Sequence, residues 1–80
     1  MNLYVGNLAW GVDDDSLREF FENYGEVTAA RVITDRETGR SRGFGFVEMP
    51  EEAARNAIAQ ADGVELDGRP LRISEARPRR

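Results

Sequence analysis

Apolar and polar residues alternate with a period of two in four short stretches of the chain, a pattern that predicts half-buried β-strands. These stretches are residues 1–8, 26–34, 42–49 and 71–75. In two further stretches, residues 13–25 and 50–62, apolar residues recur every three or four positions, which predicts helices with one buried face. The expected order of elements is therefore β-α-β-β-α-β.

Residues with known preferences for helix ends bound the two predicted helices. Asp13 is a typical N-cap, and Gly25 suits the left-handed conformation that ends many helices. Pro50 fits the first position of the second helix, which Asp62 and Gly63 are expected to end. The core-facing stripes are Leu17, Phe20, Phe21 and Tyr24 in the first helix and Ala54, Ala57, Ile58 and Ala61 in the second.

This order of elements predicts an α+β, ferredoxin-like sandwich, in which two helices cover one face of a four-stranded antiparallel sheet. The connection before the last strand contains Asp67-Gly68, a typical two-residue hairpin turn. Eighty residues suffice for one domain with a modest core. We expect the domain to comprise residues 1–76 and to be followed by a basic tail at residues 77–80.

Residues 42–49 have the clearest two-faced pattern, with glycine and apolar residues on one side and two phenylalanines between charged residues on the other. The first set is Gly43, Gly45, Val47 and Met49, and the second is Arg42, Phe44, Phe46 and Glu48. The first set is expected to face the core, where the two glycines would let the second helix approach closely. Phe44 and Phe46 would then lie on a solvated surface, where exposed rings are usually retained for contact. The alternative is that both rings belong to the core.

Residues 42–49 resemble the first signature motif of the RNA recognition motif family, Lys/Arg-Gly-Phe/Tyr-Gly/Ala-Phe-Val-x-Phe/Tyr. Only Met49 departs from this pattern, at a position expected to face the core. Residues 3–8, Leu-Tyr-Val-Gly-Asn-Leu, resemble the second motif of the family, with Tyr4 at its aromatic position. Over essentially its whole length the chain is similar to short single-domain bacterial members and to the RNA-binding part of glycine-rich proteins from cyanobacteria and plants.

The resemblance implies that unpaired bases stack on three rings of the open sheet face, with an arginine beside them on phosphate. The rings are those of Tyr4, Phe44 and Phe46, and the arginine is Arg42. Further candidates for RNA contact lie on neighbouring strands, in the loops and at the start of the tail. They are Arg31, Arg72, Ser74, Glu75 and Arg77, and in a wider set Asn7, Ile33, Arg36, Arg40 and Glu48.

Three loop features allow more than one interpretation. Trp10 could anchor the loop after the first strand or contact a ligand. The polar connection at residues 35–41 carries Arg36 and Arg40, which could close over a nucleic acid or remain in solvent. The three aspartates at residues 13–15 could suggest a metal site, but adjacent carboxylates at a helix start are typical of capping and of favourable interaction with the helix dipole. We therefore expect no metal and no cofactor.

Composition narrows the classes of function. The chain has no cysteine and no histidine, which removes disulfides, thiolate metal ligands and the commonest general base. The net charge is −4, but the acids concentrate in the predicted helices and the arginines in the strands, the central loop and the tail. Every basic residue is arginine, whose planar guanidinium group can pair with phosphate and stack on bases. No nucleophile–base pair is evident, which argues against an enzyme.

We therefore expect a non-catalytic domain that binds single-stranded RNA with weak sequence specificity, with single-stranded DNA as a second candidate ligand. The alternative is a protein-interaction module whose acidic helical surface receives a basic peptide. That surface would be formed by Glu19, Glu22, Glu51 and Glu52. No apolar run approaches the length of a membrane span, so we expect a cytoplasmic protein. We also expect it to be a monomer.

Overall fold

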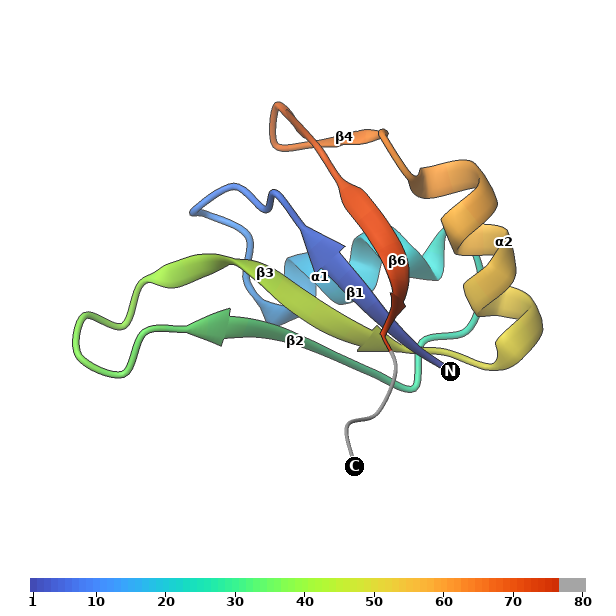
Figure 1. The fold of residues 1–80 in the computed structure, drawn as a ribbon, viewed down its shortest axis with the longest axis horizontal. Coiled ribbons are helices and arrows are strands. Elements are labelled where there is room, and N and C mark those ends of the chain that lie inside the picture. Colours follow the sequence, from blue (N-terminus) through green and yellow to red (C-terminus); the bar gives the residue numbers. More distant parts are fainter. Residues whose placement is uncertain (77–80) are drawn as a thin grey trace.

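The computed structural model describes residues 1–76 and confirms the predicted ferredoxin-like architecture (Figure 1). Four strands form one antiparallel sheet in the order β2-β3-β1-β6. They are β1 (Asn2–Gly6), β2 (Ala29–Thr34), β3 (Ser41–Glu48) and β6 (Arg72–Ala76). The helices are α1 (Asp14–Glu22), which packs against β2, and α2 (Glu51–Ala61), which packs against β6. In Figure 1 helix α1 passes behind the strands, so that the open face of the sheet is turned toward the viewer.

A small second sheet lies in the connection between α2 and β6. Its strands β4 (Glu65–Leu66) and β5 (Arg69–Pro70) pair antiparallel. The two residues between them, Asp67 and Gly68, have φ angles of 52° and 83°. Positive φ at both central positions is what a type I′ hairpin turn requires, so the hairpin predicted from Asp67-Gly68 is confirmed.

The core lies between the helices and the inner face of the sheet. Alternation puts Leu3 and Val5 of β1 and Val47 of β3 into it, and each of these side chains is fully buried. Met49 is also buried, as expected from its position after β3. The complete buried set is Leu3, Val5, Leu8, Val12, Leu17, Phe21, Val27, Val32, Val47, Met49, Ala54, Ala57, Ala61, Leu71 and Ile73. Both predicted helical stripes contribute to this core, with Phe20, Tyr24 and Ile58 half-buried against it.

The N-terminus of α1 is capped as predicted. The backbone N–H of Ser16 donates to Oδ1 of Asp13 over 2.8 Å. This hydrogen bond stabilises the charged carboxylate and lowers the pKa of Asp13 from its ordinary value of 3.8. The helix ends earlier than expected, with Asn23 in the right-handed region as its C-cap.

The expectation that Gly25 ends α1 in a left-handed conformation was wrong, because Gly25 is not among the residues with positive φ. Its lack of a side chain has another cause. A Cβ atom on Gly25 would lie 2.5 Å from the Cβ atom of Ala53, so glycine here lets the loop after α1 approach α2. At the other helix Pro50 is the N-cap, one position earlier than predicted, and Gly63 follows the end of α2 with φ of 85°, as expected.

Strand β3 is irregular at Gly43, whose φ is 84°. Val32 of β2 is paired with Gly45, but Thr34 is paired with Ser41, so the β2–β3 register shifts between these pairs. The predicted reason for Gly45 was also wrong. A Cβ atom there would collide with the carbonyl oxygen of Arg31 and the backbone of Val32, so Gly45 permits close approach of β2 and not of α2. Strand β2 also begins later than predicted, at residue 29 instead of residue 26.

Two aspartates connect the helix ends to the outer strands of the sheet. The backbone N–H of Val32 on β2 donates to Oδ1 of Asp14 over 2.7 Å, and the N–H of Ile73 on β6 donates to Oδ1 of Asp62 over 2.9 Å. Asp14 is the first residue of α1 and Asp62 is the C-cap of α2. At the start of α1 the carboxylates of Asp13 and Asp14 therefore accept hydrogen bonds from the backbone. Residues 1–76 contain no cluster of acidic side chains suited to hold a metal ion.

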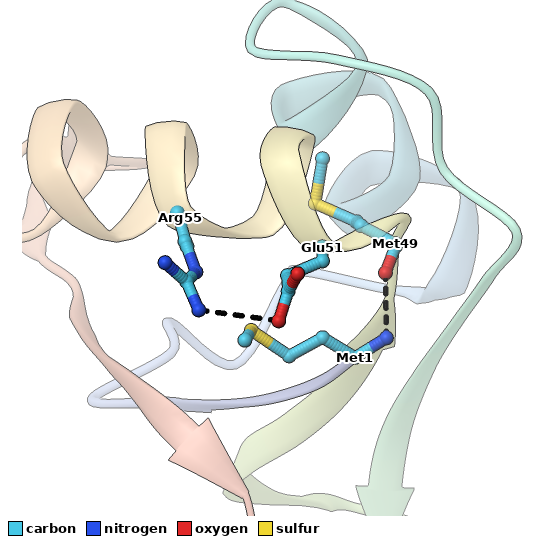
Figure 2. Close-up of polar contacts among 4 residues, drawn as sticks. All are labelled: Met1, Met49, Glu51 and Arg55. Atoms are coloured by element: carbon cyan, nitrogen blue, oxygen red, sulfur yellow. Dashed lines mark hydrogen bonds and ion pairs between the residues drawn. The ribbon is translucent and has the colours of Figure 1, made fainter.

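The start of β1 meets the start of α2 in the region shown in Figure 2. The amino group of Met1 donates to the carbonyl of Met49 over 2.8 Å, and the N–H of Met49 donates to the carbonyl of Met1 over 3.0 Å. Nearby, Arg55 and Glu51 form an exposed ion pair of 3.1 Å across one turn of α2 (Figure 2). It is the one ion pair within the described part of the chain. In the same part, neither helix is long and apolar enough to cross a bilayer.

Candidate nucleic-acid interface

Three aromatic side chains form a cluster on the open face of the sheet. Tyr4 on β1 lies directly opposite Phe46 on β3, and Phe44 lies opposite Gly6. The side chains of Tyr4 and Phe46 are 37% and 38% exposed, and Phe44 is half-buried. None of the three belongs to the core, whose β1 and β3 members are the intervening residues. The prediction that these rings occupy a solvated face is confirmed, and we call them the aromatic cluster.

The rings of the aromatic cluster differ in orientation. Tyr4 and Phe44 are inclined by 27°, with their centroids 5.8 Å apart. Phe46 stands across both, at 68° to Tyr4 and 86° to Phe44, with centroid distances of 6.1 Å. Offset and edge-to-face arrangements of this kind stabilise each ring in its position. The cluster therefore offers ring faces of fixed orientation on which flat apolar groups, such as nucleobases, can stack.

The strand register places polar candidates around the aromatic cluster. One row of directly opposed residues crosses all four strands, and the next row contains the second phenylalanine. The first row is Arg31, Phe46, Tyr4 and Ser74, and the second is Phe44, Gly6 and Arg72. A third row carries Glu48 and Asn2. Four of the predicted contacts outside the cluster thus share its face or its rim, namely Arg31, Glu48, Arg72 and Ser74. Arg42 is exposed on β3 beside the irregularity at Gly43.

The arginines near the cluster are available to an anionic ligand. Arg31, Arg42 and Arg72 are exposed, and none of them forms an ion pair within residues 1–76. An anion approaching this face need not displace a protein carboxylate from these guanidinium groups. In contrast, Arg55 on the helical side is already paired with Glu51.

Other predicted contacts have different surroundings. Glu75 is opposite Leu3, a core residue, so alternation puts its exposed side chain on the helical side of the sheet, away from the rings. The side chain of Asn7 donates from Nδ2 to the carbonyl of Pro70 over 2.7 Å, which ties the end of β1 to the β4–β5 hairpin. Ile33 is half-buried within the register shift of β2. Arg77 lies outside the described residues.

The connection between β2 and β3 is a closed turn. Asp35 and Arg40 are joined by a backbone hydrogen bond of 2.8 Å, and the carboxylate of Asp35 accepts the N–H of Glu37 over 2.8 Å. Arg36 is exposed on this turn. The guanidinium carbon of Arg40 lies 5.4 Å from the centroid of the Trp10 ring, which brings the β1–α1 and β2–β3 loops together.

Trp10 is 69% exposed and is the most exposed large hydrophobic side chain among residues 1–76. It therefore does not anchor its loop in the core, and the ligand-contact alternative gains support. The sequence offered one signal for a ligand contact at Trp10, because this residue precedes a glycine in the loop that directly follows the strand of Tyr4. What the sequence lacked was the position of Arg40 over the ring.

An open groove borders the cluster on the side of β6. It has a volume of about 660 Å³ and is lined by Tyr4, Asn7, Pro70, Arg72 and Ser74, among others. The groove places a ring, a guanidinium group and a hydroxyl around one space. Groups of these kinds stack on bases and form hydrogen bonds with base edges.

Comparisons with known proteins show which sequences resemble this chain. The family model of the RNA recognition motif matches residues 3–72. The glycine-rich RNA-binding protein 4, mitochondrial, of Arabidopsis thaliana is 58% identical over 78 residues, which cover 96% of this chain and 57% of the relative. A Nostoc sp. protein, RbpE, whose name gives it as RNA-binding, is 55% identical over 80 residues, covering 99% of this chain and 81% of that protein.

Solved structures of RNA-binding proteins are also similar to this chain. The crystal structure of RNA binding protein PG1 has a TM-score of 0.92 and 56% sequence identity, over 100% of this chain and 98% of that one. The RRM of Rna15 with bound RNA (GU) has a TM-score of 0.83 and 25% identity, over 94% and 81% of the two chains. The chain spans only part of several plant relatives it matches, from 25% to 57% of their length.

Proposed function

The chain belongs to the RNA recognition motif family, and from this membership we propose that it binds single-stranded RNA on the open face of its sheet, without catalysis. The observation that carries the proposal is the aromatic cluster, Tyr4, Phe44 and Phe46, which lies outside the core and in register across β1 and β3. The rings come from the two segments that resemble the signature motifs of the family, residues 3–8 and 42–49. The names of the relatives refer to RNA binding.

Stacking accounts for much of a moderate affinity. Each base stacked on an aromatic side chain is worth about 1–3 kcal/mol by truncation. Three such contacts approach the roughly 8 kcal/mol that corresponds to a micromolar dissociation constant. Because a ring face accepts any base, such binding is only weakly selective for sequence. Single-stranded DNA is a second candidate ligand, since stacking does not involve the 2′-hydroxyl group.

We assign the phosphate contacts to Arg31, Arg42 and Arg72, which are exposed and have no carboxylate partner within residues 1–76. Each phosphate that is neutralised on a single strand contributes about −0.7 to the slope of log K against log salt concentration. Replacing Arg31 by alanine should therefore make this slope shallower. Replacing Arg55, on the helical face, is the matched control and should leave the slope unchanged.

The contacts to base edges are assigned to groups at the rim of the aromatic cluster. Ser74 lies in the same row as Tyr4, and the groove beside β6 holds both. The remaining candidates for base or backbone contact are Arg77, Asn7, Ile33, Arg36, Arg40 and Glu48, whereas Glu75 is left out because its side chain lies on the helical side of the sheet. We add Trp10, because its exposed ring beside Arg40 would give the bound RNA a further contact beyond the edge of the sheet.

We further propose that the domain acts as a monomer in the cytoplasm. The Nostoc sp. relative is bacterial, whereas plant relatives carry mitochondrial and chloroplastic names. Sedimentation of the full chain, with and without RNA, tests the monomeric state. Fractionation of the cells that produce it tests the location.

The direct test is an amide NMR titration of the full chain with a short single-stranded RNA of mixed sequence, repeated with DNA of equal length. The largest changes in amide chemical shift should occur at Tyr4, Phe44, Phe46 and the residues directly opposite them on neighbouring strands. The ratio of RNA to DNA affinity reports whether the 2′-hydroxyl is recognised. A folded spectrum without shifts at low salt would contradict the proposal. A separate titration with a basic peptide tests the protein-interaction alternative. Chemical-shift changes restricted to the acidic helices would support that alternative.

A further inference from the structure

Gly6, at the end of β1, lies beneath the ring of Tyr4. Tyr4 and Gly6 are two residues apart on one strand, so both face the open side of the sheet. A Cβ atom built on Gly6 would lie 2.9 Å from Cε2 of Tyr4, 2.9 Å from its hydroxyl oxygen and 3.2 Å from its Cζ. The tyrosine side chain therefore lies down along its own strand, with its outer end over Gly6. This explains why Gly6 is buried although it is on the open face.

Neither the backbone nor the core requires glycine at this position. Gly6 is not among the residues with positive φ, so its backbone conformation is open to any L-residue. The three atoms closest to the added Cβ all belong to Tyr4. The groups on either side of Gly6 across the sheet are Phe44 on β3 and Arg72 on β6. The absence of a side chain at Gly6 thus matters chiefly for where the tyrosine ring can lie.

The position of the ring has consequences for the aromatic cluster. Lying over Gly6, the ring of Tyr4 is only 27° from parallel to Phe44 and 5.8 Å from it. A methyl group on residue 6 would come closer to the ring than carbon atoms in contact, which prefer about 3.5–4.0 Å. The flexible outer end of the side chain would be displaced, and the ring would tilt away from Phe44.

We propose that Gly6 is a positioning residue for RNA binding, which holds the ring of Tyr4 flat on β1 so that a base can stack on its outer face beside Phe44 and Arg72. This inference rests on the proposed function. It assigns to the fourth residue of the Leu-Tyr-Val-Gly-Asn-Leu segment a role that is exerted through its second residue. It also predicts that the two residues are coupled energetically in RNA binding.

A double-mutant cycle tests the coupling. The affinity for a fluorescent single-stranded RNA is measured for the wild type, Gly6→Ala, Tyr4→Ala and the double variant. Tyr4→Ala should weaken binding roughly 5- to 160-fold, the loss of one stacked base. Gly6→Ala should weaken binding at least about fivefold in the wild-type background and should have no further effect in the Tyr4→Ala background. Equal effects in both backgrounds, or no effect in the wild type, would overturn the inference.

A second measurement does not depend on folding of the Gly6→Ala variant. If the tyrosine ring covers Gly6, its ring current shifts the α-protons of Gly6, and Tyr4→Leu should remove this shift while the remaining amide spectrum is retained. Unshifted α-protons would overturn the inference. If Tyr4→Ala leaves RNA affinity unchanged, the proposed function itself fails. If Tyr4→Ala weakens binding and Gly6→Ala does not, only the role of Gly6 fails.

Discussion

Replacing Phe46 by alanine tests whether this ring serves RNA binding or the core. A ligand-binding ring is needed mainly for RNA affinity, whereas a core ring is needed mainly for the free energy of unfolding. Phe46 is 38% exposed, so roughly three fifths of its side chain is removed from water. Burying a whole phenylalanine side chain stabilises a protein by about 1.5–3 kcal/mol, and the buried part of Phe46 therefore contributes about 1–2 kcal/mol. We expect the free energy of unfolding of Phe46→Ala to fall by that amount. RNA affinity should fall roughly 5- to 160-fold, since one stacked base is worth about 1–3 kcal/mol.

Phe21 on α1 is the matched control, because its side chain is fully buried on the helical side. Phe21→Ala should lower the free energy of unfolding by about 3–5 kcal/mol, since truncation of a buried ring leaves a cavity. The RNA affinity of its folded fraction should stay near that of the wild type. Urea unfolding followed by circular dichroism gives the stabilities, and fluorescence anisotropy gives the affinities. A loss of about 3 kcal/mol or more in Phe46→Ala, with RNA affinity within about twofold of the wild type, would refute the reasoning.

Three further predictions concern the cap, the strand spacing and the loop. The lowered pKa of Asp13 means that its stabilising effect is complete above pH 3.8 and disappears as the pH falls through the lowered value. In urea titrations the stability gap between the wild type and Asp13→Asn should narrow below pH 3.8, and a constant gap would contradict this. Gly45→Ala should destabilise by roughly 1–3 kcal/mol because its Cβ meets the β2 backbone, whereas Gly11→Ala, with open space around it, should change stability by less than about 0.5 kcal/mol; equal urea midpoints would count against the clash. Trp10→Ala should lower RNA affinity with little loss of stability, because the ring is 69% exposed, and unchanged anisotropy curves would remove Trp10 from the binding surface.

The sequence predicted the fold well because two different periodicities alternate along it. The helical stripes and the strands appeared where expected, within one to three residues, and the Asp67-Gly68 turn was recognised from local preferences alone. Tyr4 and Phe46 were assigned to the open face by simple alternation, and both are partly exposed. Features that depend on neighbouring residues along the chain were thus within reach of pattern analysis.

Features that depend on contacts between distant segments were not predictable. Glycines at positions 25 and 45 were explained by the wrong cause, because their neighbours, Ala53 and the backbone of β2, come from other elements. The position of Arg40 over Trp10 depends on two loops meeting in space. The register that aligns Arg31 with Phe46 likewise follows from strand pairing and not from a local pattern. Periodicity tells which face a side chain occupies, but only the assembled sheet tells which residue is beside it.

The two aspartates at the helix ends have a consequence for how copies of this molecule meet one another. An outer strand with free N–H groups is a template on which a strand from another molecule can add, and sheets grow into fibres in this way. On β2 and β6 the carboxylates of Asp14 and Asp62 already occupy one outward N–H each, at Val32 and Ile73. A second copy that approached either edge would have to displace a charge-assisted hydrogen bond before it could pair. At Val32 and Ile73 the two edges are therefore less open to the addition of a strand, while the face that carries the aromatic cluster remains uncovered.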